Sequence, residues 1–122
     1  KNSMDKKSME FIKKIRETKS LPEIKKLSVF LYGHGKKMFN KEDLSLIWEI
    51  LKERKSKLLA YKELARKKIL RAYLDAREKC LKGTGTIQRI NEWSGKLPVS
   101  EETREFVKKS LREALPPHLR GE

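Results

Sequence analysis

The chain has 122 residues, with 31 lysine and arginine against 17 aspartate and glutamate, and a formal net charge of +14. One cysteine and the lack of an apolar run of about 18 residues exclude a disulfide scaffold and a membrane-spanning helix. A chain of this length can bury one core without staples, so we expect a single all-helical domain over residues 1–122. The charge predicts a polyanionic partner about as well as it predicts a lysine-rich solvated surface.

The positive charge is concentrated in residues 1–82, which carry 24 basic and 11 acidic side chains, against 7 and 6 in residues 83–122. The lone Cys80 lies on an apolar helix face, which predicts a buried core residue and favours a reducing, intracellular compartment, cytoplasmic or nuclear. The chain starts at Lys1 rather than Met and shows no signal-peptide core, so we interpret it as consistent with a domain excised from a longer protein.

The first 40 residues predict two helices. A narrow apolar stripe with lysines on its other side indicates a first helix from about Asp5 to Thr18. Ser20 and Glu23 form a predicted capping box that starts a second helix. We expect that helix to end at Gly33 or Gly35, because glycine enters the left-handed conformation at little cost.

The middle of the chain allows two arrangements. Asn40 is the predicted cap of a third helix, but the six residues 52–57 are all polar and contain neither glycine nor proline. Either this helix stops near Arg54 and a long central helix follows over about Ser56–Lys82, or Lys41–Lys82 is one rod of about 63 Å. The break is favoured, because such a rod would project from a domain of this size.

The last third predicts two more helices. Residues 83–86 close the central helix and cap a short helix over Ile87–Trp93, which Gly95 ends. Ser100 caps a final helix, and residues 116–122 form a frayed tail after two prolines. No stretch alternates with a period of two, so the expected fold class is all-α, a compact bundle of five to six helices.

The sequence offers no catalytic or metal-binding constellation. His34 and His118 have no neighbouring partner that would mark a general base, and Cys80 has no adjacent histidine. One cysteine and two distant histidines match no zinc spacing. We therefore expect a non-enzyme with no cofactor, no metal and no small-molecule substrate.

The stretch from Gly33 to Lys37 has two interpretations. Glycines followed by lysines could expose backbone amides to a phosphate, although the spacing of a nucleotide-binding loop is absent. An ordinary helix end, with lysines against the negative pole of the dipole, is the favoured interpretation.

The leading hypothesis is a basic helical module that binds DNA or RNA through backbone phosphates, without sequence choice. The residues expected to make these contacts are Lys25, Lys26, Lys36, Lys37, Arg54, Lys55, Lys57, Lys67, Lys68 and Arg71. Those from Arg54 onward are predicted to form a basic ridge at the start of the central helix.

The alternative is a protein-interaction domain of a larger regulatory assembly, of the transcription or replication type, that meets an acidic protein partner. Its predicted apolar groove consists of Met9, Tyr32, Leu64 and Trp93, which lie off the inferred core faces. Docking on an anionic membrane is a third option, but the apolar stripe of the basic first helix is too narrow to favour it.

Overall fold

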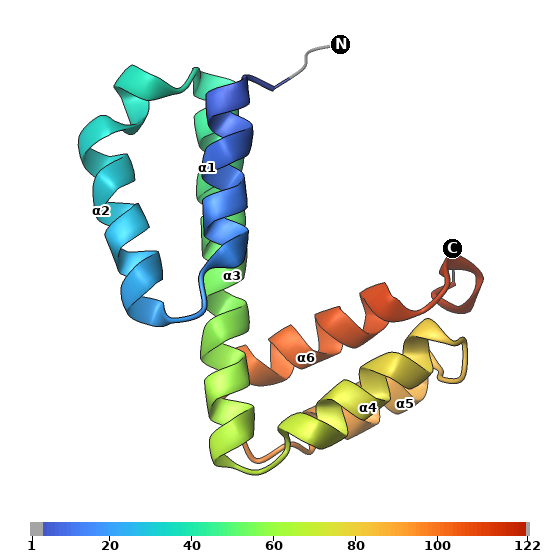
Figure 1. Ribbon diagram of the computed structural model, residues 1–122. Helices are drawn as coiled ribbons and strands as arrows, with labels where there is room; N and C mark the ends of the chain where they lie inside the picture. Colours follow the sequence, from blue (N-terminus) through green and yellow to red (C-terminus); the bar gives the residue numbers. More distant parts are fainter. Residues whose placement is uncertain (1–3, 122) are drawn as a thin grey trace. The chain divides into compact units, whose positions relative to one another are not determined.

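The computed structural model describes residues 4–121, and these residues form six α-helices, one short 3-10 helix and no strand (Figure 1). The helices are α1 (Lys6–Glu17), α2 (Leu21–Met38), α3 (Lys41–Arg66), α4 (Leu70–Leu81), α5 (Ile87–Gly95) and α6 (Glu101–Ala114), followed by the 3-10 helix η1 (Pro117–Leu119). The all-α class predicted from the sequence is confirmed.

The chain divides into two compact units, an N-terminal unit (Lys1–Leu58) and a C-terminal unit (Leu59–Glu122). The sequence predicts one core, whereas the buried apolar residues form two clusters. Along α3, the polar run 52–57 lies between Leu51, in the first cluster, and Leu64, in the second. That run therefore separates two cores instead of breaking a helix.

The N-terminal unit packs α1, α2 and the first part of α3 around one apolar cluster, and Figure 1 shows α1 lying along α3. Phe11 and Ile15 of α1, Ile24 of α2 and Ile47 of α3 are buried in this cluster. A buried polar contact accompanies them: the Ser8 hydroxyl donates to the carboxylate of Asp43 at 2.6 Å.

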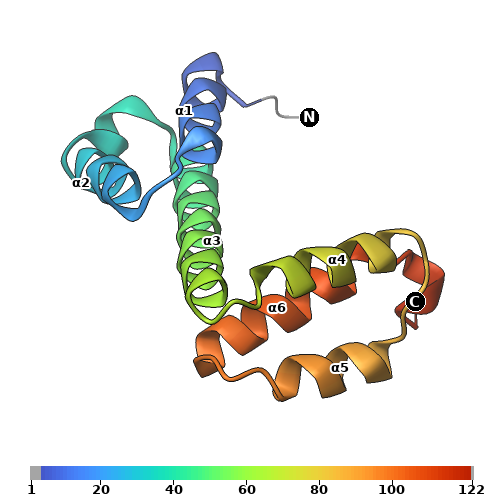
Figure 2. The same cartoon turned by 60° about the horizontal axis from the view of Figure 1, so that its bottom comes forward.

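The C-terminal unit packs α4 and α5 against α6, which Figure 2 shows from a second side. Its core contains Tyr73 and Cys80 of α4, Ile90 of α5 and Val107 of α6. The hydroxyl groups of Tyr73 and Ser110 are hydrogen-bonded to each other. Burial raises the pKa of both the Tyr73 phenol and the Cys80 thiol.

Four predicted helix caps are confirmed, whereas Ser56, the predicted cap of the central helix, lies inside α3. The side-chain oxygens of Ser20, Asn40, Thr86 and Ser100 each accept a hydrogen bond from the backbone amide three residues later, at 2.7–3.4 Å. The box at the start of α2 is shifted by one residue, because Glu23 accepts from the amide of Lys19 instead of that of Ser20.

The predicted central helix over Ser56–Lys82 is wrong, as is the break near Arg54. α3 continues through the polar run to Arg66, and the chain then turns before α4. Lys68 takes the left-handed conformation (φ 62°), while the amide of Ile69 donates to Leu64 O at 2.8 Å and that of Lys68 to Ala65 O at 3.0 Å. This is a complete Schellman motif with lysine where glycine is usual, so no glycine marks it in the sequence.

α4 ends with the same motif, in its ordinary form. Gly83 is left-handed (φ 82°), and the amide of Thr84 donates to Lys79 O at 3.0 Å. The predicted end near Gly83 is confirmed, because glycine adopts this conformation without strain.

Two further boundaries differ from the prediction. α2 passes through Gly33 and Gly35 and ends at Met38. A Cβ at Gly35 would lie 2.9 Å from Leu44 Cδ1, so this glycine permits close approach of α2 and α3. The tail predicted to fray forms η1, and Leu119 packs on the core of the C-terminal unit; Glu122 lies outside the described residues.

Candidate nucleic-acid interface

The outward side of α2 combines lysines with an unusually exposed aromatic ring. Lys25, Val29, Tyr32 and Lys36 have the spacing i, i+4, i+7 and i+11, which places them along one face of the helix. We call these four residues the Tyr32 strip. Tyr32 is 85% exposed and Val29 63% exposed, and both lysines are exposed.

The ring of Tyr32 is supported by α3. Its centroid lies 5.1 Å from that of Trp48, in an edge-on contact. Trp48 packs partly buried against the core of the N-terminal unit. The contact limits the motion of the Tyr32 ring while leaving most of its surface open to solvent.

A second basic strip follows another side of α2. Lys26, Phe30 and Lys37 have the spacing i, i+4 and i+11, and both lysines are exposed. Phe30 is engaged by the protein itself, since its ring stacks on Phe11 with centroids 5.8 Å apart and lies 4.9 Å from the ring of His34. Phe30 is 37% exposed, so this strip offers charge and less open aromatic surface than Tyr32 provides.

Carboxylates do not neutralise these lysines. Glu78–Lys82 and Glu101–Arg104 are ion pairs of the C-terminal unit, and neither involves a lysine of α2. The N-terminal unit has 16 basic and 8 acidic side chains, and the C-terminal unit 15 and 9. The four predicted lysines of α2 are therefore available to an external anion.

Arg54, by contrast, is already hydrogen-bonded within the protein. Its guanidinium donates to the carbonyl oxygen of Thr18 from both Nε, at 3.2 Å, and Nη2. Thr18 is buried and caps the C-terminal end of α1. Arg54 thus ties α1 to α3, which gives it a structural role, and its phosphate contact stays a prediction.

The remaining predicted cations do not form one ridge on one helix. Lys55 and Lys57 are exposed on α3 in the N-terminal unit. Lys67 and Lys68 lie in the turn after α3, and Arg71 follows on α4, all exposed and in the C-terminal unit. The ridge was predicted from helical spacing, which the left-handed Lys68 interrupts.

The stretch from Gly33 to Lys37 forms no phosphate-binding turn. It is helical throughout, so its backbone amides belong to the hydrogen-bond ladder of α2. Lys36 and Lys37 lie in the last turn of the helix, where cations are favourable to the dipole.

The four residues predicted to line a partner groove are divided between the two units, and one of them is buried. Met9 (54% exposed) and Tyr32 belong to the N-terminal unit, and Leu64 and Trp93 to the C-terminal unit. Leu64 is fully buried in the core, where it accepts the closing hydrogen bond of the Schellman motif through its carbonyl oxygen. It therefore cannot contact a partner through its side chain.

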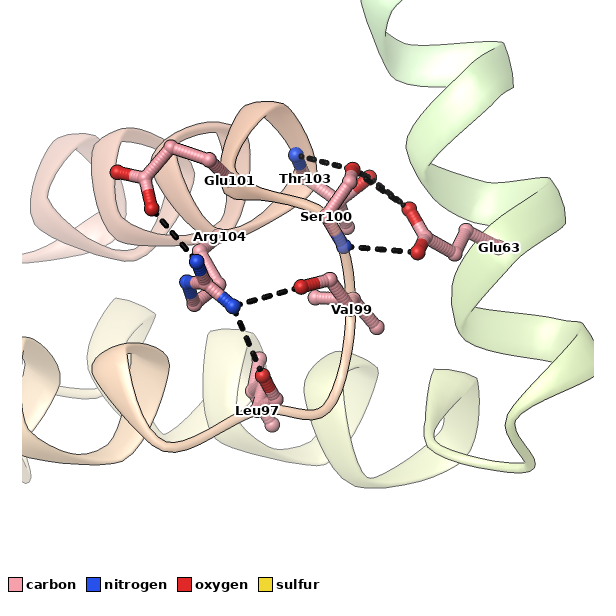
Figure 3. A network of polar contacts seen from close by, with 7 residues as sticks. All are labelled: Glu63, Leu97, Val99, Ser100, Glu101, Thr103 and Arg104. Atoms are coloured by element: carbon pink, nitrogen blue, oxygen red, sulfur yellow. Dashed lines mark hydrogen bonds and ion pairs between the residues drawn. The ribbon is translucent and has the colours of Figure 1, made fainter.

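A polar network around Glu63 fixes the start of α6, and no local sequence pattern predicts it (Figure 3). The carboxylate of Glu63 accepts from Thr103 Oγ1 at 2.6 Å and from the amide and hydroxyl of Ser100, both at 2.8 Å. These bonds, led by that of Thr103, hold the pKa of Glu63 below its ordinary value. A carboxylate at a helix N-terminus acts as a structural cap.

Arg104 completes this network on the other side of the α5–α6 connection. Its Nη1 donates to Val99 O at 2.6 Å and its Nη2 contacts Glu101 Oε1 at 2.6 Å (Figure 3). Arg104 also lowers the pKa of Glu101, first through this hydrogen bond. The connection is thereby fixed to the first turn of α6.

No described helix has the length and apolar character needed to cross a membrane, and residues 4–121 contain no cluster of His, Cys, Asp or Glu suited to a metal ion. In comparisons with known proteins, no family model matches the sequence, and no curated protein or solved structure is significantly similar to it.

Sequence reasoning identified the lysines of α2 but missed Val29 and Trp48 as parts of the same surface. The spacing of Val29 from Lys25 and Tyr32 was a usable signal. The contact of Trp48 with Tyr32 joins residues of different helices, and no local pattern predicts it.

Proposed function

We propose that the chain is a non-catalytic nucleic-acid-binding module, and that the Tyr32 strip of α2 is its contact surface. The lysines of the strip bind backbone phosphates and Tyr32 stacks on a base. This role places the chain in the cytoplasm or the nucleus.

One observation carries the proposal: an 85% exposed tyrosine lies between two exposed lysines on one helix face. Lys25 and Lys36 are about 16 Å apart along the helix axis, which spans several nucleotides of a single strand. A ring with a free face stacks on any base, and such stacking contributes about 1–3 kcal/mol per base. The arrangement therefore favours single strands over duplexes and gives little sequence preference.

Fluorescence anisotropy with labelled single strands of about 12 nucleotides, DNA and RNA, and with matching duplexes tests the proposal. Each phosphate contact on a single strand contributes about −0.7 to the slope of log K against log salt. The variant K25Q/K36Q is expected to reduce that slope by about 1.4. K108Q/K109Q removes the same charge from α6 and is the matched control. No binding at low salt, a flat salt response, or equal losses in both variants would contradict the proposal.

Substitution of Tyr32 tests the stacking step separately. Y32A is expected to lower single-strand affinity about 5- to 100-fold, the equivalent of one lost stacking contact, while Y32F retains it. Duplex affinity, measured in parallel, is expected to change little. An equal loss on single strand and duplex would show that Tyr32 acts through the fold.

An acidic protein partner is the second candidate function, favoured by the exposed apolar surface of Val29 and Tyr32 beside the same lysines. Such a partner would contact Val29, which base stacking does not require. V29S is therefore expected to leave nucleic-acid affinity unchanged, whereas a loss of binding to an acidic protein partner in V29S would favour an apolar docking surface.

A further inference from the structure

A groove of about 450 Å³ lies in the C-terminal unit, along α4, the 82–86 loop and α5. Ala76 and Cys80 of α4, Ile90 and Trp93 of α5, and Leu111 of α6 supply its apolar surface. α4 and α5 both pack on α6, and Leu111 is fully buried beneath the groove.

The end of the groove near the loop is positively charged. Lys79 of α4 and Arg89 of α5 both line it, and both side chains are exposed. Arg89 lies in the first turn of α5, which contains no acid, so the cation faces the positive pole of the helix dipole. Neither residue forms an ion pair within the described part of the chain. Asp75, the carboxylate among the lining residues, precedes Lys79 by one turn of α4.

The volume of the groove is that of a site for a small organic ligand. Sites for small organic ligands measure roughly 300–1,000 Å³ and are mostly apolar with a few polar groups that fix orientation. The groove falls within this range, and its apolar walls with two cations at one end suit a small molecule that has an apolar body and an anionic group.

We propose that this groove binds a small amphipathic organic anion. Its apolar body lies on Ala76, Ile90 and Trp93, and its anionic group pairs with Lys79 and Arg89. This site is independent of the Tyr32 strip, and the proposal does not depend on nucleic-acid binding.

Dodecanoate is the test ligand, with dodecanol and dodecyltrimethylammonium as neutral and cationic analogues, all below their micelle concentrations. The full chain carrying W48F reports binding through the fluorescence of Trp93, its remaining tryptophan. Dodecanoate is expected to bind saturably and at least about 5-fold more tightly than dodecanol, the effect of about 1 kcal/mol from charge-assisted contacts. Equal affinities of the acid and the alcohol, or no saturable binding, would overturn the proposal.

Substitutions locate the site. K79Q/R89Q is expected to lower dodecanoate affinity to that of dodecanol, whereas K108Q/K109Q, with the same change of charge on α6, is expected to leave it unchanged. A76L fills the groove and is expected to abolish binding of both ligands; A72L does the same from an exposed position of the same wall, should A76L fail to fold by circular dichroism. Unchanged affinity in a folded groove-filling variant would overturn the proposal.

Discussion

The turn after α3 places Lys68 in an unfavourable, left-handed backbone conformation. A side chain in the left-handed region costs about 1–2 kcal/mol, and glycine avoids most of this cost. K68G is therefore expected to raise the free energy of unfolding by about 1 kcal/mol, measured by urea denaturation. K68A removes the same charge without relieving the strain and is expected to be near neutral. Equal effects of K68G and K68A would contradict this account.

Gly33 and Gly35 lie two residues apart in α2 but differ in what surrounds them. A Cβ at Gly33 meets nothing within 4 Å, whereas one at Gly35 meets Leu44 Cδ1 at 2.9 Å. G33A is expected to stabilise the protein by about 0.5–1 kcal/mol, the helix propensity gain. G35A gains the same propensity but must displace the Leu44 side chain, so its thermal midpoint is expected to fall below that of G33A. The reverse order would contradict this close approach.

Glu63 links stability to pH. Its folded-state pKa lies below the ordinary 4.5, so the carboxylate form is favoured by folding. The contribution of the Glu63 carboxylate to folding stability is fully present above its unfolded-state pKa and is lost as pH falls through its folded-state pKa. E63Q is therefore expected to be less stable than the parent chain at pH 7, and the difference is expected to shrink between about pH 5 and pH 3. E53Q, at an exposed position of α3, is the control, and a difference that is constant with pH would refute the linkage.

At the scale of the helices, starts with a side-chain cap were predictable, whereas the start of α4, where Ile69 makes no cap bond, was missed. Ser20, Asn40, Thr86 and Ser100 each satisfy an amide three residues away, so these four starts carry their signal locally. Most ends were inferred from glycine, which allows a helix to end but does not require it to. α4 ends at the left-handed Gly83. α2 instead continues through Gly33 and Gly35, because tertiary packing outweighs the low helix propensity of glycine.

The candidate site was likewise only partly predictable from the sequence. Helical spacing placed the lysines of α2 on the surface, but it could not show that Arg54 reaches Thr18, 36 residues earlier. Nor could it show that Leu64 is buried, because Leu64 lies on the helix side that faces the second core. Contacts between residues distant in sequence decide whether a cation or an apolar side chain is accessible to a partner. The spacing of residues along one helix does not reveal these contacts.

The link between α1 and α3 provides a test that separates structure from binding. R54K keeps the charge but loses the guanidinium geometry that contacts Thr18 from two nitrogens. It is expected to lower the free energy of unfolding by about 1–2 kcal/mol in urea titrations, with single-strand affinity unchanged when the protein is folded. The matched R71K, at an exposed position of α4, is expected to be near neutral in stability. A loss of affinity without a loss of stability would return Arg54 to the binding surface.

For the whole molecule, unbalanced charge is the dominant electrostatic feature. The net charge is +14, and the ion pairs Glu78–Lys82 and Glu101–Arg104 each join residues only three or four positions apart. Repulsion among lysines therefore opposes folding more than ion pairs favour it, and added salt screens this repulsion, with a Debye length near 10 Å at 0.1 M. The thermal midpoint is expected to rise between about 20 and 200 mM sodium chloride. Sucrose at equal osmolality controls for non-ionic solute effects, and a midpoint that falls with salt would mean that attractive pairs outweigh the repulsion.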